Sequence, residues 1–171
     1  MRVLRLIGLV LVLAVACHLA TIWLMPRILL AAVTTTMQAN GLPVNELVHF
    51  DRRTAKDRAI VRPSPDLLYS ICLYDLSLGP VHIATTEMPQ TYWSISGYAA
   101  NTDNFFVVND RDAAGRPVDI LIGHADQRSS SADYLSPSVR GVILLRMVVE
   151  SNEHQKVLGQ FRNEVVCEPA S

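Results

Sequence analysis

The sequence predicts a mainly β domain with one C-terminal helix, preceded by an N-terminal transmembrane helix. Positions 6–25 form an uncharged apolar stretch that is long enough, as a helix, to cross the hydrocarbon core of a bilayer. Beyond it, short β-branched and aromatic runs alternate with turn residues, which is typical of an antiparallel meander, sandwich or barrel. No helix-length segment separates successive runs, so a parallel α/β sheet is not expected.

The composition limits the class of protein. The chain has 171 residues, which suits one domain with a hydrophobic core. Half of the residues are hydrophobic, only 18% are charged, and the net charge is -1. A disordered chain is therefore not expected, and no basic field is present to attract a nucleic-acid backbone.

The flanks of the apolar stretch predict its orientation. Arg2 and Arg5 precede it, and the positive-inside rule places such a short basic end in the cytoplasm. Everything after Pro26 is then exported, and the apolar helix over residues 6–25 contacts membrane lipid. Trp23 near the far end suits the interfacial aromatic belt.

A cleaved signal peptide is the alternative to an uncleaved anchor. Ala14 and Ala16 have the small-x-small spacing of a cleavage site. The apolar run nevertheless continues to Met25, whereas the apolar part of a signal peptide normally ends at the cut. An anchor is therefore favoured, and a freely soluble form or one lipidated at Cys17 remains the alternative.

The remaining elements follow in order. We expect an anchor over residues 1–26, a helical stalk over 27–45 that stops near Asn40 and Gly41, and an exported β domain over 46–171. Ser151 is a suitable N-cap for a helix over residues 152–161. The predicted strands cover residues 68–74, 81–85, 92–96, 105–108, 118–122, 141–149 and 165–167.

Several motifs, in consistent order, resemble the bacterial family called domain of unknown function 1254. The resemblance covers about two-thirds of the chain, although each motif alone is weak. The motifs are Pro63-Ser64-Pro65-Asp66-Leu67-Leu68-Tyr69-Ser70, Tyr74-Asp75-Leu76-Ser77-Leu78-Gly79-Pro80, Tyr92-Trp93-Ser94, Asn104-Phe105, Arg111 and Gly141-Val142-Ile143-Leu144-Leu145-Arg146. The sequence departs from the family pattern at Ser64, Leu67 and Ala99.

The resemblance implies a β-sandwich or jelly-roll-like body. In a bacterium, the predicted anchor and its orientation place this body in the periplasm, attached to the inner membrane. Members of the family commonly continue into a second domain, called domain of unknown function 1214, which we do not find in this sequence. If the two domains normally pack together, the exported domain is expected to bind a companion-family protein or a second copy of itself.

Five residues at the matched motifs are candidates for a ligand site: Asp66, Tyr69, Asp75, Arg111 and Arg146. In the first interpretation, Arg146 and Asp66 bind a small anionic or hydroxylated ligand beside Tyr69. In the second, Arg146 forms a structural ion pair with Asp75 or Asp66, because an arginine on a buried strand needs a carboxylate partner. We favour the structural interpretation.

No catalytic residue, metal site or cofactor is predicted. The histidines show neither His-x-His nor His-Glu-x-x-His spacing, and no Gly-x-Ser-x-Gly, Gly-x-Gly-x-x-Gly or P-loop motif is present. Cys72 and Cys167 face an oxidising compartment and either form a disulfide or act as two small buried hydrophobic residues. We therefore expect a binding or assembly module, with an envelope enzyme acting on a small molecule as the alternative.

Overall fold

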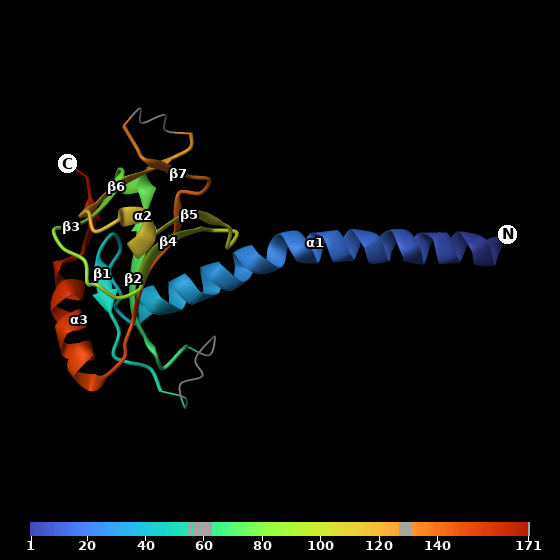
Figure 1. The fold of residues 1–171 in the computed structure, drawn as a ribbon. Coiled ribbons are helices and arrows are strands. Elements are labelled where there is room, and N and C mark those ends of the chain that lie inside the picture. The colour runs from blue at the N-terminus through green and yellow to red at the C-terminus, as the bar shows by residue number, and fades with distance from the viewer. Residues whose placement is uncertain (55, 57–62, 127–130, 171) are drawn as a thin grey trace.

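The computed structural model describes residues 1–54, 56, 63–126 and 131–170 of the chain. A long N-terminal helix leads into a β domain built from two sheets (Figure 1). The predicted mainly β fold, with an N-terminal helix and a C-terminal helix, is thereby confirmed.

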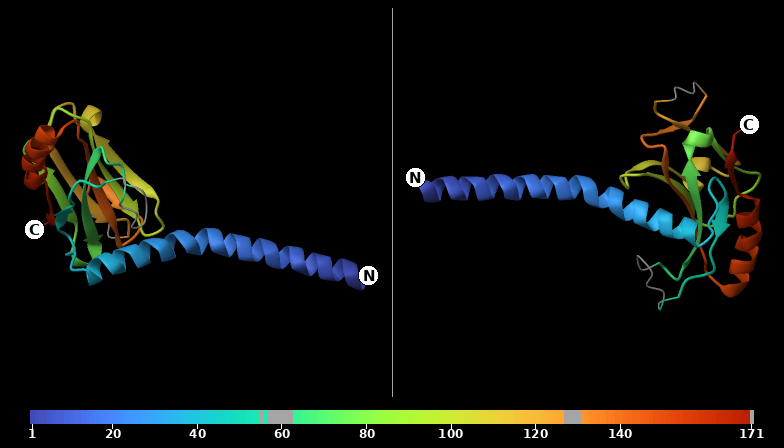
Figure 2. Two further views of the ribbon diagram at one scale, coloured as in Figure 1. Left: turned by 90° about the horizontal axis from the view of Figure 1, so that it is seen from below. Right: turned by 180° about the vertical axis from the view of Figure 1, so that it is seen from behind.

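Helix α1 (Arg2–Ala39) has no buried residue and is the one described helix that is long and apolar enough to cross a membrane. Figures 1 and 2 show that it bends partway along its length. Pro26 lies inside the helix and explains a bend, because proline has no N–H group and its ring clashes with the preceding turn. The helix ends at Ala39, so residues 40–45 of the predicted stalk are not helical; Gly41 has a φ of 90°, which favours glycine.

The first sheet has five strands in the order β1-β2-β8-β4-β5, and all its neighbours are antiparallel. The second sheet has four strands in the order β7-β6-β3-β9 and is mixed, because β6 and β7 run parallel. The strands are β1 (Leu47–His49), β2 (Leu67–Asp75), β3 (Val81–Thr85), β4 (Trp93–Ala99), β5 (Asn104–Asn109), β6 (Val118–His124), β7 (Tyr134–Ser136), β8 (Arg140–Val148) and β9 (Val166–Pro169).

The hydrophobic core lies between the two sheets. Along β8, Ile143, Leu145 and Met147 are buried, whereas the residues between them are only half-buried. This alternation places every second side chain on the inner face. The outer face of the five-stranded sheet therefore carries the other set, which includes Leu144 and Arg146.

Helix α3 (Asn152–Glu164) connects β8 to β9 and thus joins the two sheets. Ser151 caps it as predicted, because its hydroxyl accepts a hydrogen bond from the backbone N–H of His154 at 3.1 Å. Leu158 on this helix is fully buried in the core.

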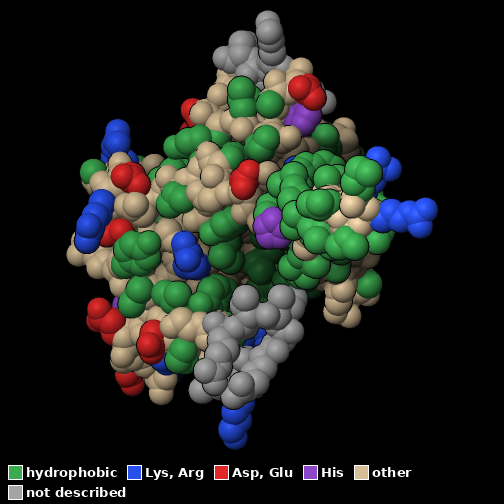
Figure 3. All heavy atoms as spheres, turned by 90° about the vertical axis from the view of Figure 1, so that its right-hand side faces the viewer, with side chains coloured by type: hydrophobic (Ala, Val, Ile, Leu, Met, Phe, Trp, Pro, Cys, Tyr) green, Lys and Arg blue, Asp and Glu red, His purple; other side chains and the backbone are tan. Residues whose placement is uncertain are grey.

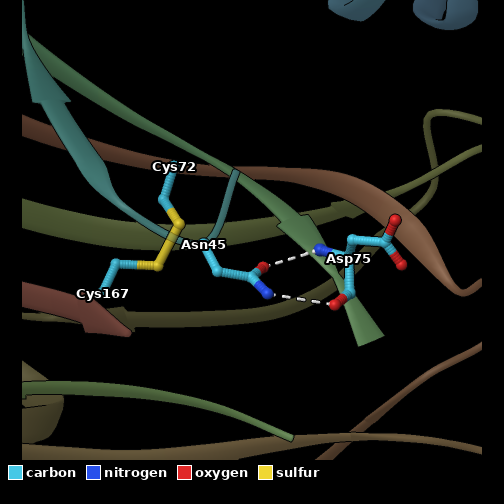
Figure 4. Close-up of a disulfide and its surroundings, with 4 residues drawn as sticks. All are labelled: Asn45, Cys72, Asp75 and Cys167. Atoms are coloured by element: carbon cyan, nitrogen blue, oxygen red, sulfur yellow. Dashed lines mark hydrogen bonds between the residues drawn. A yellow bond between two sulfur atoms is a disulfide. The ribbon is translucent and has the colours of Figure 1, made fainter. Parts of the chain in front are cut away.

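A disulfide links the two sheets between β2 and β9. Cys72 and Cys167 are bonded, and their Cα atoms lie 6.5 Å apart. Figure 4 shows the bond beside Asn45 and Asp75. The alternative interpretation of these residues, as two unbonded hydrophobic side chains, does not hold in this structure.

Candidate functional site

The structure brings together two of the five predicted ligand residues. Tyr69 on β2 and Arg146 on β8 are cross-strand neighbours on the outer face of the five-stranded sheet. Asp66 precedes β2 and is exposed, Asp75 lies at the other end of β2, and Arg111 is exposed on the short helix α2 (Asp110–Ala113). The predicted set therefore does not form one pocket.

The Asp75 end of this outer face is fully paired. Arg140 donates from Nε to Asp75 Oδ2 at 2.7 Å, and the backbone N–H of Ser77 donates to Asp75 Oδ1 at 3.0 Å. Asn45 is buried and binds the backbone of Asp75 twice: its amide donates to the carbonyl at 3.1 Å, and its carbonyl accepts from the N–H at 2.7 Å (Figure 4). Each polar group in this network thus has a partner.

The pKa of the Asp75 carboxyl reflects this network. Burial by itself raises the pKa, but the hydrogen bonds from Ser77 and the ion pair with Arg140 outweigh burial, so the pKa lies below its usual value. Asp75 is therefore ionised at neutral pH and fixes the first residue of β8 against the last residue of β2.

The predicted ion pair of Arg146 with Asp75 or Asp66 is wrong. Asp75 pairs with Arg140, and Asp66 Oδ1 lies 3.9 Å from Arg52 Nη2. The antiparallel register explains the difference, because it sets Asp75 opposite Arg140 and Tyr69 opposite Arg146. Asp66 thus lies just before β2 and Asp75 at its far end, whereas the residue of β2 opposite Arg146 is Tyr69.

Among the described residues, Arg146 has almost no hydrogen-bonding partners. Its Nη2 atom lies 3.5 Å from Ser96 Oγ, at the outer limit for a hydrogen bond, and its Nε atom is buried without a partner. Ser94, which lies opposite Arg146 on β4, has no exposed surface, and its hydroxyl also has no partner. Sequence reasoning identified Arg146 but not these serines, because a serine in a strand gives no signal of its own.

Apolar side chains surround this polar group on the outer face. Ile71 and Leu144 are half-buried cross-strand neighbours, and Val148 follows Arg146 on β8. At the Asp75 end, the last turns of α1 line a cavity of about 360 Å³ together with residues of β2 and β8. Figure 3, viewed from the N-terminal end of α1, shows hydrophobic side chains gathered around a hollow beside the helix.

A second polar pair lies on the inner side of the same sheet. His49 Nδ1 and Ser70 Oγ are 2.8 Å apart, and His49 lines a cavity of about 500 Å³ that also reaches Cys167. Burial lowers the pKa of the His49 imidazole, and the positive charge of Arg162 lowers it further. The pair has a base and a hydroxyl at hydrogen-bond distance, but Ser70 has no exposed surface with which to meet a substrate.

In the part of the chain that the structure describes, no three His, Cys, Asp or Glu side chains lie close enough together to hold a metal ion. His82 and Asp119 are close, at 2.7 Å, but they form a pair without a third ligand among the described residues.

Comparisons with known proteins find one matching family and similar solved structures. A family model described as "Protein of unknown function (DUF1254)" matches residues 44–169. The crystal structure of the VPA0106 protein from Vibrio parahaemolyticus is similar, with a TM-score of 0.70 and 16% sequence identity over 89% of this chain and 37% of that chain. A structure of an uncharacterized protein from Burkholderia cenocepacia matches with a TM-score of 0.49 and 20% identity over 64% of this chain and 32% of that chain.

No functionally curated protein matches the sequence. The chain spans about a third of the length of the two solved proteins that it resembles. The likeness to the VPA0106 protein concerns the fold, whereas the family model covers well over half of the present sequence. The chain therefore belongs to the DUF1254 family of proteins of unknown function.

Proposed function

We propose that this protein is a single-pass membrane protein whose exported β domain is a binding module. In this proposal α1 anchors the chain in a bacterial inner membrane, the N-terminus is cytoplasmic, and the β domain lies in the periplasm. The binding surface is the outer face of the five-stranded sheet, formed by β2, β8 and β4.

The anchor is supported by α1. No residue of this helix is buried, and all side chains of residues 6–25 are exposed, so this apolar stretch has no protein partner among the described residues. Such a surface is stable in lipid and costly in water. Arg27 lies over the ring of Trp23, 4.2 Å from its centroid, and this pair suits the polar boundary of a membrane.

The observation that carries the binding role is the unsatisfied polar group within an apolar sheet face. Buried polar groups normally have hydrogen-bond partners, and exceptions call for an explanation. Here two such groups, on Ser94 and Arg146, face each other across neighbouring strands. The surrounding apolar side chains, such as Leu144, exclude water and strengthen any contact with a ligand.

Membrane fractionation and intact mass test the anchor together. An uncleaved anchor predicts that the protein stays in the membrane after an alkaline carbonate wash, has the mass of the complete sequence, and is digested by protease added to spheroplasts. A product that starts at Cys17, with or without a lipid on that residue, would overturn the anchor. Protection from protease in intact spheroplasts would overturn the orientation.

A second candidate function is assembly with a protein of the companion family. The observation that favours it is that only 37% of the VPA0106 chain is matched, so the domain in that protein is joined to a larger body. We propose that the β domain of the present chain packs against a companion-family protein through an equivalent contact. The same apolar outer face is the docking surface in this candidate.

Crosslinking in membranes followed by pull-down tests this assembly. We expect a companion-family protein to be captured, and capture to be lost in Leu144→Glu, which places a charge on the outer face. Leu135→Glu is the control, because Leu135 is an exposed residue of β7 in the other sheet. Bait that returns alone from both wild type and control would overturn the assembly.

A further inference from the structure

We propose that Arg146, Ser94 and Ser96 form a binding site for an oxyanion, meaning a phosphate or carboxylate group, on the outer face of the five-stranded sheet. This inference rests on the proposed role of that face as a binding surface. It adds the chemistry of the ligand and the residues that hold it.

Arg146 carries a positive charge that no described carboxylate balances. Arg146 is half-buried between Leu144 and Val148, and it forms no ion pair with a carboxylate among the described residues. A guanidinium group that is partly removed from water loses hydration, and a partner anion normally compensates for this loss. An anionic ligand would supply the missing charge.

Arg146 and the neighbouring serines also have hydrogen-bonding groups available for a ligand. The guanidinium group is planar and presents its N–H donors as a fork, which matches the oxygens of a carboxylate or phosphate. The Nε–H donor of Arg146 and the hydroxyl of Ser94 are both unused. Ser96 lies two residues further along β4, and its hydroxyl faces Nη2 at 3.5 Å. Together these groups offer donors to two or three oxygens of one ligand.

Arg146 controls the access of an anion to the two serines. Ser94 and Ser96 have no exposed surface, whereas Arg146 retains some. An anion therefore reaches the serines only when the guanidinium group swings outward. The single long contact to Ser96 resists this movement weakly. Tyr69, in contrast, is held in place, because its hydroxyl accepts a hydrogen bond from the backbone N–H of Ser64 at 2.9 Å.

The same chemistry has two natural sources, a free ion and a lipid headgroup. Helix α1 lines a cavity with Leu73 and Arg140, which both belong to the outer face, so the helix approaches the domain on this side. Figure 3 looks along the helix onto the hollow beside it. If α1 spans the membrane, this face is turned toward the lipid headgroups.

Thermal unfolding of the full-length protein in a nonionic detergent tests the site. Inorganic phosphate is titrated at constant ionic strength against chloride, and unfolding is followed by tryptophan fluorescence. Wild type should gain Tm with phosphate, because a ligand that binds only the folded state stabilises it by mass action. Arg146→Met should lose this gain, and Arg146→Lys should bind about tenfold more weakly, because lysine lacks the fork.

Arg140→Met is the matched control. Arg140 lies on the same strand and the same face but is already paired with Asp75, so this variant should keep the phosphate response. Ser94→Ala removes one free hydroxyl without adding bulk and should weaken the response several-fold. It also keeps the test valid if Arg146→Met fails to fold.

A second experiment separates the two sources. Full-length protein is placed in nanodiscs of phosphatidylglycerol or of phosphatidylcholine, and Tm is compared. Stabilisation by phosphatidylglycerol alone that disappears in Arg146→Met assigns the anion to a lipid headgroup; stabilisation by inorganic phosphate assigns it to a free ion.

The proposal is overturned if neither phosphate nor phosphatidylglycerol raises the Tm of the wild type, or if Arg146→Met responds as the wild type does. Loss of the response in Arg140→Met would also overturn it, because binding would then follow net charge rather than this site. Failure of the membrane-fractionation test leaves the phosphate titration unaffected, so the two proposals fail separately.

Discussion

Each end of the outer face of the five-stranded sheet carries an arginine, and the two arginines differ in their hydrogen-bond partners. At one end, Arg140 donates to Asp75 at 2.7 Å, and Asp75 is also bonded by Ser77 and braced by Asn45. At the other end, Arg146 has one long contact to Ser96 and an unpartnered Nε. Both arginines belong to β8 and lie on the same face. We call these regions the paired end and the unpaired end.

The difference teaches that the surroundings of an arginine decide its role. At the paired end, both carboxylate oxygens and both backbone polar groups of Asp75 have partners, and this network stabilises the fold. At the unpaired end, the folded protein bears the cost of groups without partners, which is characteristic of functional sites. Substitutions should therefore reduce stability at the paired end and should leave it nearly unchanged at the unpaired end.

The largest expected effect on stability comes from removing the disulfide. Its first cysteine, Cys72, lies midway along β2, between the two ends. The bond closes a sequence separation of 95 residues. Removing a bond across a loop of this length, as in the double variant Cys72→Ala/Cys167→Ala, should lower the free energy of unfolding by about 3–5 kcal/mol. Urea unfolding of the full-length protein in detergent measures this loss.

Cys17→Ala is the control for the disulfide variant, since Cys17 is an exposed, free cysteine of α1. Reduction of the wild type should reproduce the effect of the double variant. A loss below about 1 kcal/mol would show that packing between the two sheets, rather than the disulfide, holds them together.

The next effect is expected from Asn45→Ala, which removes both side-chain contacts to the Asp75 backbone. The buried N–H and carbonyl groups of Asp75 would lose partners, at about 1–3 kcal/mol for each group. We expect a total loss of about 2–4 kcal/mol, because backbone shifts recover part of the cost. Asn163→Ala, at an exposed position of α3, should change stability little. Equal effects of the two variants would contradict the special status of the paired end.

A smaller effect is expected from Asp75→Asn, with a characteristic pH dependence. The pKa of Asp75 is lowered in the folded state, so the unfolded state binds more protons at acidic pH. Its stabilising contribution is therefore fully present above the usual aspartate pKa and is lost as pH falls through the lowered value. The variant should lose about 1 kcal/mol at neutral pH, after allowance for the exposure of Arg140, and less at acidic pH. Urea unfolding at a series of pH values measures this, and a pH-independent difference would contradict it.

Much of the fold could be predicted from β-branched and aromatic runs, but short or interrupted strands could not. Strands β1 and β7 have three residues each, too few for a periodic signal. The β-branched and aromatic residues that predict a strand over 92–96 are followed by Gly97, and glycine is depleted in strands. The structure continues this strand, β4, to Ala99, and the ring of Phe106 occupies the space where a side chain of residue 97 would lie.

The site could be predicted only in part, for a similar reason. Arg146 and Tyr69 were candidates because both lie in motifs that resemble the family, and Arg146 also interrupts an apolar strand. The choice between Asp75 and Asp66 as the partner of Arg146 depended on strand register, which single-residue patterns do not specify. Ser94 and Ser96 became visible only when the register of β4 against β8 placed them beside Arg146.

The smallest effect, and the sharpest comparison, is expected from two serines that have no exposed surface, Ser94 and Ser70. Ser70 Oγ is 2.8 Å from His49 Nδ1, so Ser70→Ala leaves a half-buried imidazole nitrogen without its partner and should cost about 1–2 kcal/mol. Ser94 Oγ has no partner to lose, so Ser94→Ala should change stability by less than about 0.5 kcal/mol, or raise it slightly. Urea unfolding in the absence of phosphate measures both. A loss at Ser94 as large as that at Ser70 would mean that the folded protein already satisfies the Ser94 hydroxyl, and the unpaired end would then be a structural site like the paired one.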